Sequence, residues 1–442
     1  VMGGGCSGGP SRGKVFVTAD GSAMTFVSDA DIFDERQPQT PNVIYPSGYL
    51  MFREGTRYRI DNGKVTWMRD NNGNKVSFTY SGNNLVGIDD SLNRHVSISG
   101  GAISFKGANG VTRTLTVYTA PLSAALRKHP DGSPEYAIKT FAQLFSLQNP
   151  QNGMFDIPVT TAVELPDGRQ YQFRYDSYAN LAQVILPTGG RIDYDWTTGT
   201  YVYGDHVYGV YNQVNDRRTA LSATATTYET HTHYSVNATT TTVSTVDTLD
   251  PNNGDALISR TKHYFNGYWL SPPDPFNPYQ GWANAREYQT EFLAADGVTV
   301  LRRVNNTWRQ RAAVGWYTGN PDFEPPNDPR LVETTMTLVD TNQVSKVTAI
   351  DPNNPTGPVG FDQYNNKTKV WEYDFGSGAP GPLLRQTVTS YLTSGYDTLV
   401  PNSSAPNLSL TAHIRSLPSQ ISVYDAGGVE RARSTFEYDN YT

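Results

Sequence analysis

The sequence contains a single cysteine, Cys6, among its 442 residues. One cysteine excludes an intrachain disulfide and any metal site built from several thiolates. Charged residues make up only 17% of the chain, and 35 basic groups against 42 acidic ones give a net charge of −7. The basic residues form no cluster, so we expect no nucleic-acid partner. No apolar run approaches the ~18–20 residues that cross a bilayer, so we expect no membrane span.

Tyrosine is unusually frequent, with 28 Tyr beside 17 Phe. Many of these rings alternate with polar residues. Tyr171, Phe173 and Tyr175 fall on one side of an extended chain, and Gln172 and Arg174 fall on the other. This period of two predicts strands with one buried face.

A spacing rule repeats along the chain, in which a glycine is followed by large apolar side chains three, five and seven places later. The rule applies at Gly168 (Tyr171, Phe173, Tyr175), Gly189 (Ile192, Tyr194, Trp196) and Gly73 (Val76, Phe78, Tyr80), and in part at Gly55 (Tyr58, Ile60). Glycine permits the positive φ of a tight turn, and odd offsets place the rings on one sheet face.

Further turns are expected where an aspartate can accept hydrogen bonds from nearby backbone amides, at Asp70, Asp90 and Asp176. Strand, turn and strand in succession predict a string of β-hairpins. Helix is scarce. The best candidate covers residues 133–145, capped by Ser133, and residues 122–128 add a turn. We therefore expect an all-β chain with a short helical insert near 122–146.

Tyr-Asp pairs close several of the expected strands: Tyr175-Asp176, Tyr194-Asp195, Tyr373-Asp374, Tyr424-Asp425 and Tyr438-Asp439. With the segments at 57–75 and 173–181, these pairs resemble the repeat unit of the YD-repeat, or RHS-repeat, proteins. The resemblance is good over 46–200, patchy over 360–442 and weak over 201–359. Ala179 departs from it, because the motif prefers glycine there.

The resemblance implies a ribbon of β-hairpins that spirals into a hollow shell. Bacterial shells of this kind commonly enclose a C-terminal toxin, and related animal shells form the bodies of cell-adhesion proteins. Bacterial members often end in a core segment that cuts itself; the sequence contains neither that segment nor a recognisable toxin module. The resemblance also implies an extracellular or cell-surface location.

The chain divides into four regions on these patterns. Residues 1–45 form a Gly-rich lead-in with the first strands, and residues 46–200 form a YD-repeat hairpin array that contains the helical insert. Residues 201–359 form a divergent, Tyr/Thr-rich continuation of the shell. Residues 360–442 contain further YD repeats that are cut short at the C-terminus.

A lone hairpin is only marginally stable in water, so neighbouring hairpins must extend the sheet and cover its edges. The preference for Tyr over Leu or Ile suits a surface with an apolar base and a wet hydroxyl, as on the wall of a water-filled shell. A conventional two-sheet sandwich with Tyr on its rim is the alternative.

Several groups of residues are candidate chemical sites. His231 and His233 share one strand face, as zinc ligands can, but no third ligand is evident. Asp193 with Asp195, or Glu372 with Asp374, have the reach of a glycosidase acid pair. The segments at 250–255 and 351–355 mimic calcium loops without the full motif. Solvated strand residues and plain turns account for all of these patterns.

Exposed aromatic side chains offer a further alternative, because rings can stack on sugars. The candidate glycan platform comprises Trp196, Tyr201, Tyr203, Trp269 and Trp282. Three functions therefore remain open. The first is a non-enzymatic structural segment that encapsulates or displays a cargo such as a toxin, with further repeats or cargo of the same polypeptide as partners. The second is a module that binds surface glycans, and the third is a carbohydrate-active enzyme. We expect no catalytic residue, no metal and no cofactor.

Overall fold

A computed structural model describes residues 11–18, 22–33, 45–145, 153–203, 206–237, 242–266, 282–283, 285–311, 327–392 and 414–438. For residues 198–203, 206–211 and 242 it describes the path of the backbone alone. Strands take 59% of the structure and helices 4%, which confirms the all-β prediction.

The first thirteen strands of the described structure are β1 (Ser11–Val17), β2 (Thr25–Phe33), β3 (Gly48–Met51), β4 (Arg57–Asp61), β5 (Lys64–Arg69), β6 (Lys75–Ser81), β7 (Asn84–Asp90), β8 (His95–Ser99), β9 (Ala102–Lys106), β10 (Thr112–Pro121), β11 (Pro158–Glu164), β12 (Gln170–Tyr175) and β13 (Leu181–Ile185).

The next thirteen described strands are β14 (Arg191–Tyr203), β15 (His206–Ala220), β16 (Thr230–Asn237), β17 (Thr242–Asp250), β18 (Ala256–Phe265), β19 (Glu287–Leu293), β20 (Val300–Arg309), β21 (Arg330–Leu338), β22 (Gln343–Thr348), β23 (Lys369–Ser377), β24 (Leu383–Tyr391), β25 (Pro418–Tyr424) and β26 (Glu430–Thr435). The described helices are one five-residue α-helix, α1 (Phe141–Phe145), and short 3-10 turns at Ala108–Gly110, Leu122–Ala124 and Pro251–Asn253. No helix in these ranges has the length and apolar character needed to cross a membrane.

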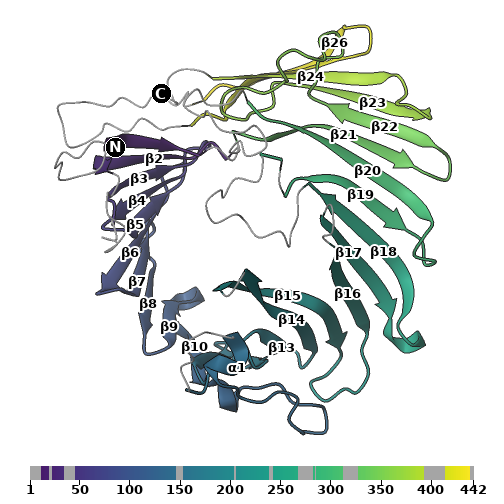
Figure 1. The fold of residues 1–442 in the computed structure, drawn as a ribbon. Helices are drawn as coiled ribbons and strands as arrows, with labels where there is room; N and C mark the ends of the chain where they lie inside the picture. The colour runs from purple at the N-terminus through teal and green to yellow at the C-terminus, as the bar shows by residue number, and fades with distance from the viewer. Residues whose placement is uncertain are drawn as a thin grey trace, which may run out of the picture.

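All 26 strands belong to one antiparallel sheet in which each strand pairs with the strands before and after it in the chain. The sheet continues across residues 200 and 360, where the expected regions meet. Figure 1 shows the ribbon descending from β2 to β10, passing through β13–β15, rising along β16–β20 and returning over the top to β26. The sheet is not closed, since β1 and β26 do not pair within the described structure.

The sheet is a single layer. In the described residues, the buried side chains include more polar and charged residues than apolar ones, and several of the apolar ones are alanines. A sandwich would bury an apolar face of each sheet against the other. The alternative of two packed sheets is therefore wrong, and the polar contacts of the ribbon must supply stability that a core normally supplies.

The helical insert differs from the prediction. Residues 133–140 are not helical, and the helix begins only at Phe141. Thr140 caps it, because the Gln143 amide donates to Thr140 Oγ1 at 3.2 Å and the Gln143 side chain accepts from the Thr140 amide at 2.8 Å. Ser133 instead donates to Asp131 in a tight turn. Glu135, which the helix would have contained, instead accepts hydrogen bonds from Arg127.

One turn geometry recurs along the ribbon. The first residue is an aspartate whose Oδ1 accepts the amides two and four places later; at Asp176 these are Tyr178 N–H at 2.8 Å and Asn180 N–H at 2.9 Å. The fourth residue has a positive φ, which makes a type I turn with a bulge. The same turn occurs at Asp70, Asp90, Asp362 and Asp425. The turns expected at Asp70, Asp90 and Asp176 are thus confirmed.

Bulges interrupt the pairing at regular places. In the β12–β13 pair, Arg174 lies opposite Gln183 but Tyr175 lies opposite Leu181, so Ala182 is an extra residue. The β4–β5 and β6–β7 pairs contain bulges of the same kind, whereas β5–β6 and β7–β8 do not. A bulge bends the strand and increases its twist. The repeated bulges therefore account for the curl of the ribbon.

At five of these bulges, an aromatic side chain forms a hydrogen bond to the disrupted strand. It donates a hydrogen bond to the backbone carbonyl of the residue just before the extra residue. The five bonds are Tyr80 to Val65 O (2.9 Å), Tyr175 to Thr160 O (2.6 Å), Trp196 to Leu181 O (2.9 Å), Trp308 to Glu287 O (2.8 Å) and Tyr438 to Pro418 O (2.8 Å). In the first three cases the donor lies 15 residues after the acceptor.

These bonds give a different reason for tyrosine from the one inferred from the sequence. A wet shell wall would leave the hydroxyl to water. At these positions the hydroxyl or indole N–H instead satisfies a carbonyl of the sheet itself, which leucine or phenylalanine cannot do. Burial raises the pKa of Tyr175, as expected for a hydroxyl withdrawn from water.

We expect Tyr175→Phe to lower the free energy of unfolding by about 0.5–1.5 kcal/mol, because Thr160 O loses its donor. Tyr171→Phe is the matched control. Tyr171 lies in the same strand, its side chain is exposed, and no hydrogen bond from its hydroxyl occurs in the described structure. Urea denaturation measures both variants, and equal losses would contradict the role of the carbonyl bond.

We expect Ala179→Gly to raise the melting temperature. Ala179 has a φ of 63° in the Asp176 turn, a conformation that costs an L-residue with a Cβ about 1–2 kcal/mol. Glycine removes that strain, at the expense of a more flexible unfolded chain. Differential scanning calorimetry measures the shift, and a lower melting temperature would contradict the prediction.

Candidate functional site

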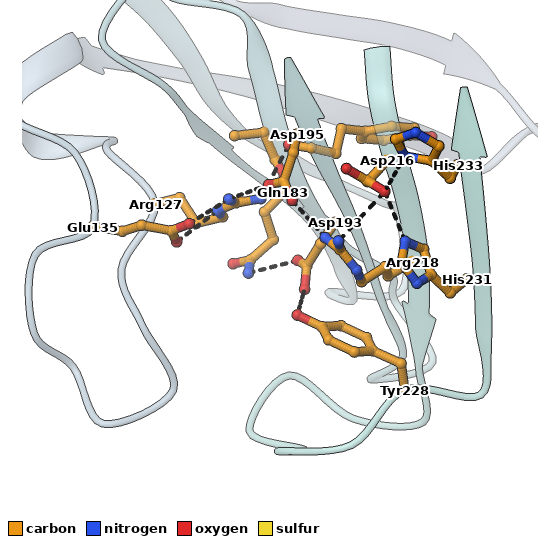
Figure 2. A network of polar contacts seen from close by, with 12 residues as sticks. Arg127, Glu135, Gln183, Asp193, Asp195, Asp216, Arg218, Tyr228, His231 and His233 are labelled. Carbon is orange, nitrogen blue, oxygen red and sulfur yellow. Dashed lines mark hydrogen bonds and ion pairs between the residues drawn. The ribbon is translucent and has the colours of Figure 1, made fainter. Parts of the chain in front are cut away.

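The densest polar cluster lies on one face of β13–β16, and we call it the polar network (Figure 2). Its members come from neighbouring strands and three loops: Arg127, Glu135, Gln183, Arg191, Asp193, Asp195, Asp216, Arg218, Tyr228, His231, His233 and Asp255. The strand register brings them together. Between β14 and β15, Asp193 lies opposite Arg218 and Asp195 lies opposite Asp216. Between β15 and β16, Arg218 lies opposite His231 and Asp216 lies opposite His233.

Arg127 links the insert to the sheet. It is 5% exposed, and its guanidinium donates to Glu135 at 2.5 and 2.8 Å and to Asp195 at 2.5 Å. It also donates to the carbonyls of Ala182 and Tyr194, both at 3.0 Å. Burial lowers the pKa of Arg127, but the two carboxylates outweigh burial and raise it, so the group stays charged. The residue clamps the insert onto β13 and β14.

Asp195 bridges two arginines. Its second oxygen accepts from Arg218 at 2.5 Å, opposite the bond from Arg127. Burial by itself raises the pKa of Asp195, but the hydrogen bonds from both guanidinium groups lower it below its ordinary value. Removal of Asp195 would leave the buried guanidinium of Arg127 with fewer carboxylate partners, which destabilises the fold because a buried charge loses compensation.

The two histidines share one carboxylate. Asp216 Oδ1 lies 2.7 Å from His231 Nε2 and 2.9 Å from His233 Nδ1, and His231 Nδ1 lies 2.8 Å from Asp255 Oδ1. Burial raises the pKa of Asp216, but hydrogen bonds from both imidazoles lower it overall. In the described part of the chain, no group of three His, Cys, Asp or Glu residues is arranged to hold a metal ion. The histidines therefore act here as hydrogen-bond partners of carboxylates.

Asp193 forms the other end of the network. It accepts from Gln183 at 2.9 Å and Tyr228 at 3.1 Å, and Arg191 Nε lies 2.8 Å away. Burial and the neighbouring carboxylate raise the pKa of Tyr228. Asp193 and Asp195 do share one face, as the sequence indicates, but each carboxylate is engaged by cationic or neutral donors. The arrangement attaches neighbouring strands to one another.

The network was only partly visible in the sequence. The pair Tyr194-Asp195 is expected to close a strand, yet β14 continues beyond it to Tyr203. Arg127, Arg218, Tyr228 and Asp216 were missed. The sequence does contain three pairs of polar residues with a spacing of two, at 193/195, 216/218 and 231/233. It does not show the strand register that places these pairs opposite one another.

The other Tyr-Asp pairs have different surroundings. Asp176 and Asp425 begin the recurrent turn, each directly after a tyrosine that ends its strand. Tyr373 and Asp374 lie inside β23, where Asp374 Oδ1 accepts the Phe375 amide at 2.8 Å. Tyr438 makes the bulge bond described above, and Asp439 lies outside the described residues.

The remaining repeat residues occupy turns and strands. Gly55, Gly73, Gly168 and Gly189 all have positive φ. Six aromatic residues of the repeat lie in strands: Tyr58 in β4, Phe78 and Tyr80 in β6, Tyr171 and Phe173 in β12, and Tyr194 in β14.

Two members of the candidate glycan platform, Trp196 and Trp282, have described side chains. Trp196 is half-buried and donates its indole N–H to Leu181 O, and Trp282 is half-buried. Trp269 and the side chains of Tyr201 and Tyr203 lie outside the described residues. The other candidate acid, Glu372, pairs with Arg385. Asp250 and Asp351 accept the amides two residues later, as plain turns do.

Comparison with known proteins gives limited information. No family model matches the chain, and no curated protein matches it. Two crystal structures are similar over 93% of this chain: TcdB2-TccC3-Cdc42 at 10% identity and TcdB2-TccC3 at 8%, each with a TM-score of 0.13. The chain spans only 26% and 27% of those chains.

We expect the protein to lose stability below about pH 4, the ordinary range of aspartate. The pKa values of Asp195 and Asp216 are lowered by folding, so their contribution is present above the unfolded pKa and is lost as the pH falls through the folded one. Asp195→Asn should lower the melting temperature at pH 7 and reduce its acid dependence. Asp340→Asn, at an exposed turn, is the control, and parallel curves from pH 3 to 7 for all three proteins would contradict the prediction.

Proposed function

We propose that this chain is a non-enzymatic structural segment of a YD-repeat shell, exported or attached to the cell surface, which encloses or displays polypeptide cargo. The observation that carries the proposal is that the ribbon returns to contact its own beginning. A ribbon with this path has the geometry of a wall around an interior, and a wall needs no catalytic group.

The contact joins the turn between β3 and β4 to two late segments. Arg53 donates to Asn365 O at 3.0 Å and Tyr364 O at 3.4 Å, 311 residues away. Arg415 N–H donates to Arg53 O at 2.6 Å, and Glu54 forms an isolated bridge with Ile414. We call these contacts the coil contact.

The late side of the coil contact uses the recurrent turn. Asn366, the last residue of the Asp362 turn, donates to Arg415 O at 2.7 Å and is buried. Ile414 is also buried, against Gly55. The turn that makes hairpins along the ribbon therefore also holds the two ends of the ribbon together, which is what a stacked coil requires.

The repeated turn and bulge geometry supports the YD-repeat assignment. Five turns share one aspartate geometry, and five bulges share one aromatic bond. Four of the turns and all five aromatic bonds join neighbouring strands, so similar units can be added along the chain without a common core; the fifth turn, at Asp362, makes the coil contact. The carboxylates of the polar network are bound to arginine, histidine or tyrosine, which favours a structural role for them.

The coil contact provides the test of the shell. A Cβ at Gly55 would lie 2.5 Å from Ile414 Cγ1, whereas a Cβ at Gly168 would meet nothing within 4 Å, and both glycines have positive φ. Gly55→Ala and Gly168→Ala therefore share the same backbone strain, and only the first opens the coil contact. We expect small-angle scattering to show a larger radius of gyration for Gly55→Ala alone. Unchanged or equally changed scattering in both variants would contradict a self-contacting ribbon.

The cargo role is tested by limited proteolysis of the full-length protein. We expect a polypeptide carried with the shell to resist proteinase K in the parent protein and to be digested in the Gly55→Ala variant, with Gly168→Ala behaving as the parent. Rapid digestion of every segment in the parent would argue against enclosure and leave display on the surface as the role.

A further inference from the structure

A groove of about 740 Å³ lies beside the first half of β10. Its lining residues come from β10 and the segment just before it on one side and from the end of β11 and the following turn on the other: Val111, Thr112, Arg113, Thr114, Thr116, Glu164, Leu165, Pro166, Asp167 and Gly168. The volume is in the range of about 300–1,000 Å³ typical of ligand sites. It takes no part in the polar network or the coil contact.

The groove exists because β11 is shorter than β10. β10 pairs with β9 from Thr112 onward, but β11 meets it only from Thr116, which lies opposite Glu164. After Glu164 the chain enters the turn at 165–169 and returns as β12, leaving β10. On the β11 side, residues 112–115 therefore form an unpaired edge inside an otherwise continuous sheet, and we call it the β10 notch.

The direction of the backbone groups in the β10 notch follows from the register. Val117 N–H donates to Gly101 O, so Val117 faces β9. In an antiparallel ladder alternate residues face opposite neighbours. Thr112 and Thr114 therefore present their N–H and C=O groups to the notch, and no backbone partner for them occurs in the described residues.

The threonine side chains are already held on the sheet face. Thr114 Oγ1 lies 2.9 Å from Ser104 Oγ, and Lys106 donates to Thr112 Oγ1 at 2.7 Å. The unused hydrogen-bonding capacity of the notch is thus mainly backbone capacity, in the plane of the sheet and at the repeat of a β-strand. An edge of this kind is a template for another strand.

We propose that the β10 notch binds an extended polypeptide segment, which adds a short strand beside Thr112–Thr114. The occupant supplies two donors and two acceptors in strand spacing, which is the recognition mode of β-strand addition. A saccharide fits less well, because no aromatic side chain lines the groove for a sugar ring to stack on. So few hydrogen bonds hold only a segment that is tethered nearby or present at high concentration.

The test uses amide hydrogen exchange on the whole chain. The probe is an acetylated and amidated Lys-Thr-Val-Thr-Val-Lys peptide at about 5 mM, a concentration suited to a contact of few hydrogen bonds. We expect the Thr112 and Thr114 amides to exchange rapidly without peptide and at least twofold more slowly with it. The Arg113 and Leu115 amides, which face β9, should not change.

Two controls separate backbone pairing from other binding. The same peptide with every amide N-methylated should give no protection. Thr114→Pro removes an amide that faces the notch and leaves the β9 ladder intact, as proline at a free edge does, so it should abolish protection at Thr112 while the circular dichroism melt of the sheet is retained.

Four results would overturn the proposal. These are unchanged exchange with the peptide, equal protection by the methylated peptide, slow exchange of Thr112 and Thr114 before any peptide is added, and protection by chitotetraose in place of the peptide. The last would assign the groove to saccharides. None of these outcomes depends on whether the ribbon encloses cargo.

Discussion

The hydrogen bond from an aromatic side chain to the carbonyl beside a bulge is the interaction on which the curved sheet depends. A single-layer sheet of many strands must twist and bend to return to its start, and bulges provide the bend while disrupting the ladder. A carbonyl left without a donor costs free energy wherever water is excluded. Tyr80, Tyr175 and Trp196 each supply that donor from a fixed distance along the chain, so bending and hydrogen bonding are satisfied together.

Polar contacts replace much of what a core would contribute. The buried residues include Arg127, Asp193 and His231, each paired across strands or between the sheet and the insert. Buried charges stabilise a structure only when their partners stay in place, so such a network favours one register over its alternatives. In a ribbon with two wet faces, register cannot be set by hydrophobic burial alone. The network therefore specifies how β13–β16 align as much as it stabilises them.

The coil contact and the β10 notch show two consequences of the same architecture. A ribbon that meets itself through turns, at Arg53 and Asn365, can form a wall whose interior depends on a small contact. A ribbon built from strands of unequal length leaves edges within the sheet, as at Thr112 and Thr114. The coil contact holds a late part of the ribbon against its beginning. The β10 notch is the edge at which we propose that another polypeptide binds.

Local chemistry in the sequence was enough to predict the all-β class and the hairpins, because alternation and turn residues act within a few positions: the Asp70, Asp90 and Asp176 turns follow from their own side chains. The helix expected from Ser133 begins only at Phe141, and Glu135 instead pairs with Arg127, which in turn contacts β13 and β14. The pair Tyr194-Asp195 was expected to close a strand, but β14 continues past it and Asp195 joins two arginines, Arg127 and Arg218. Periodicity thus determined which residues form strands, and only the tertiary structure decided their register, their bulges and their ion pairs, because those depend on contacts between segments that are distant in the chain.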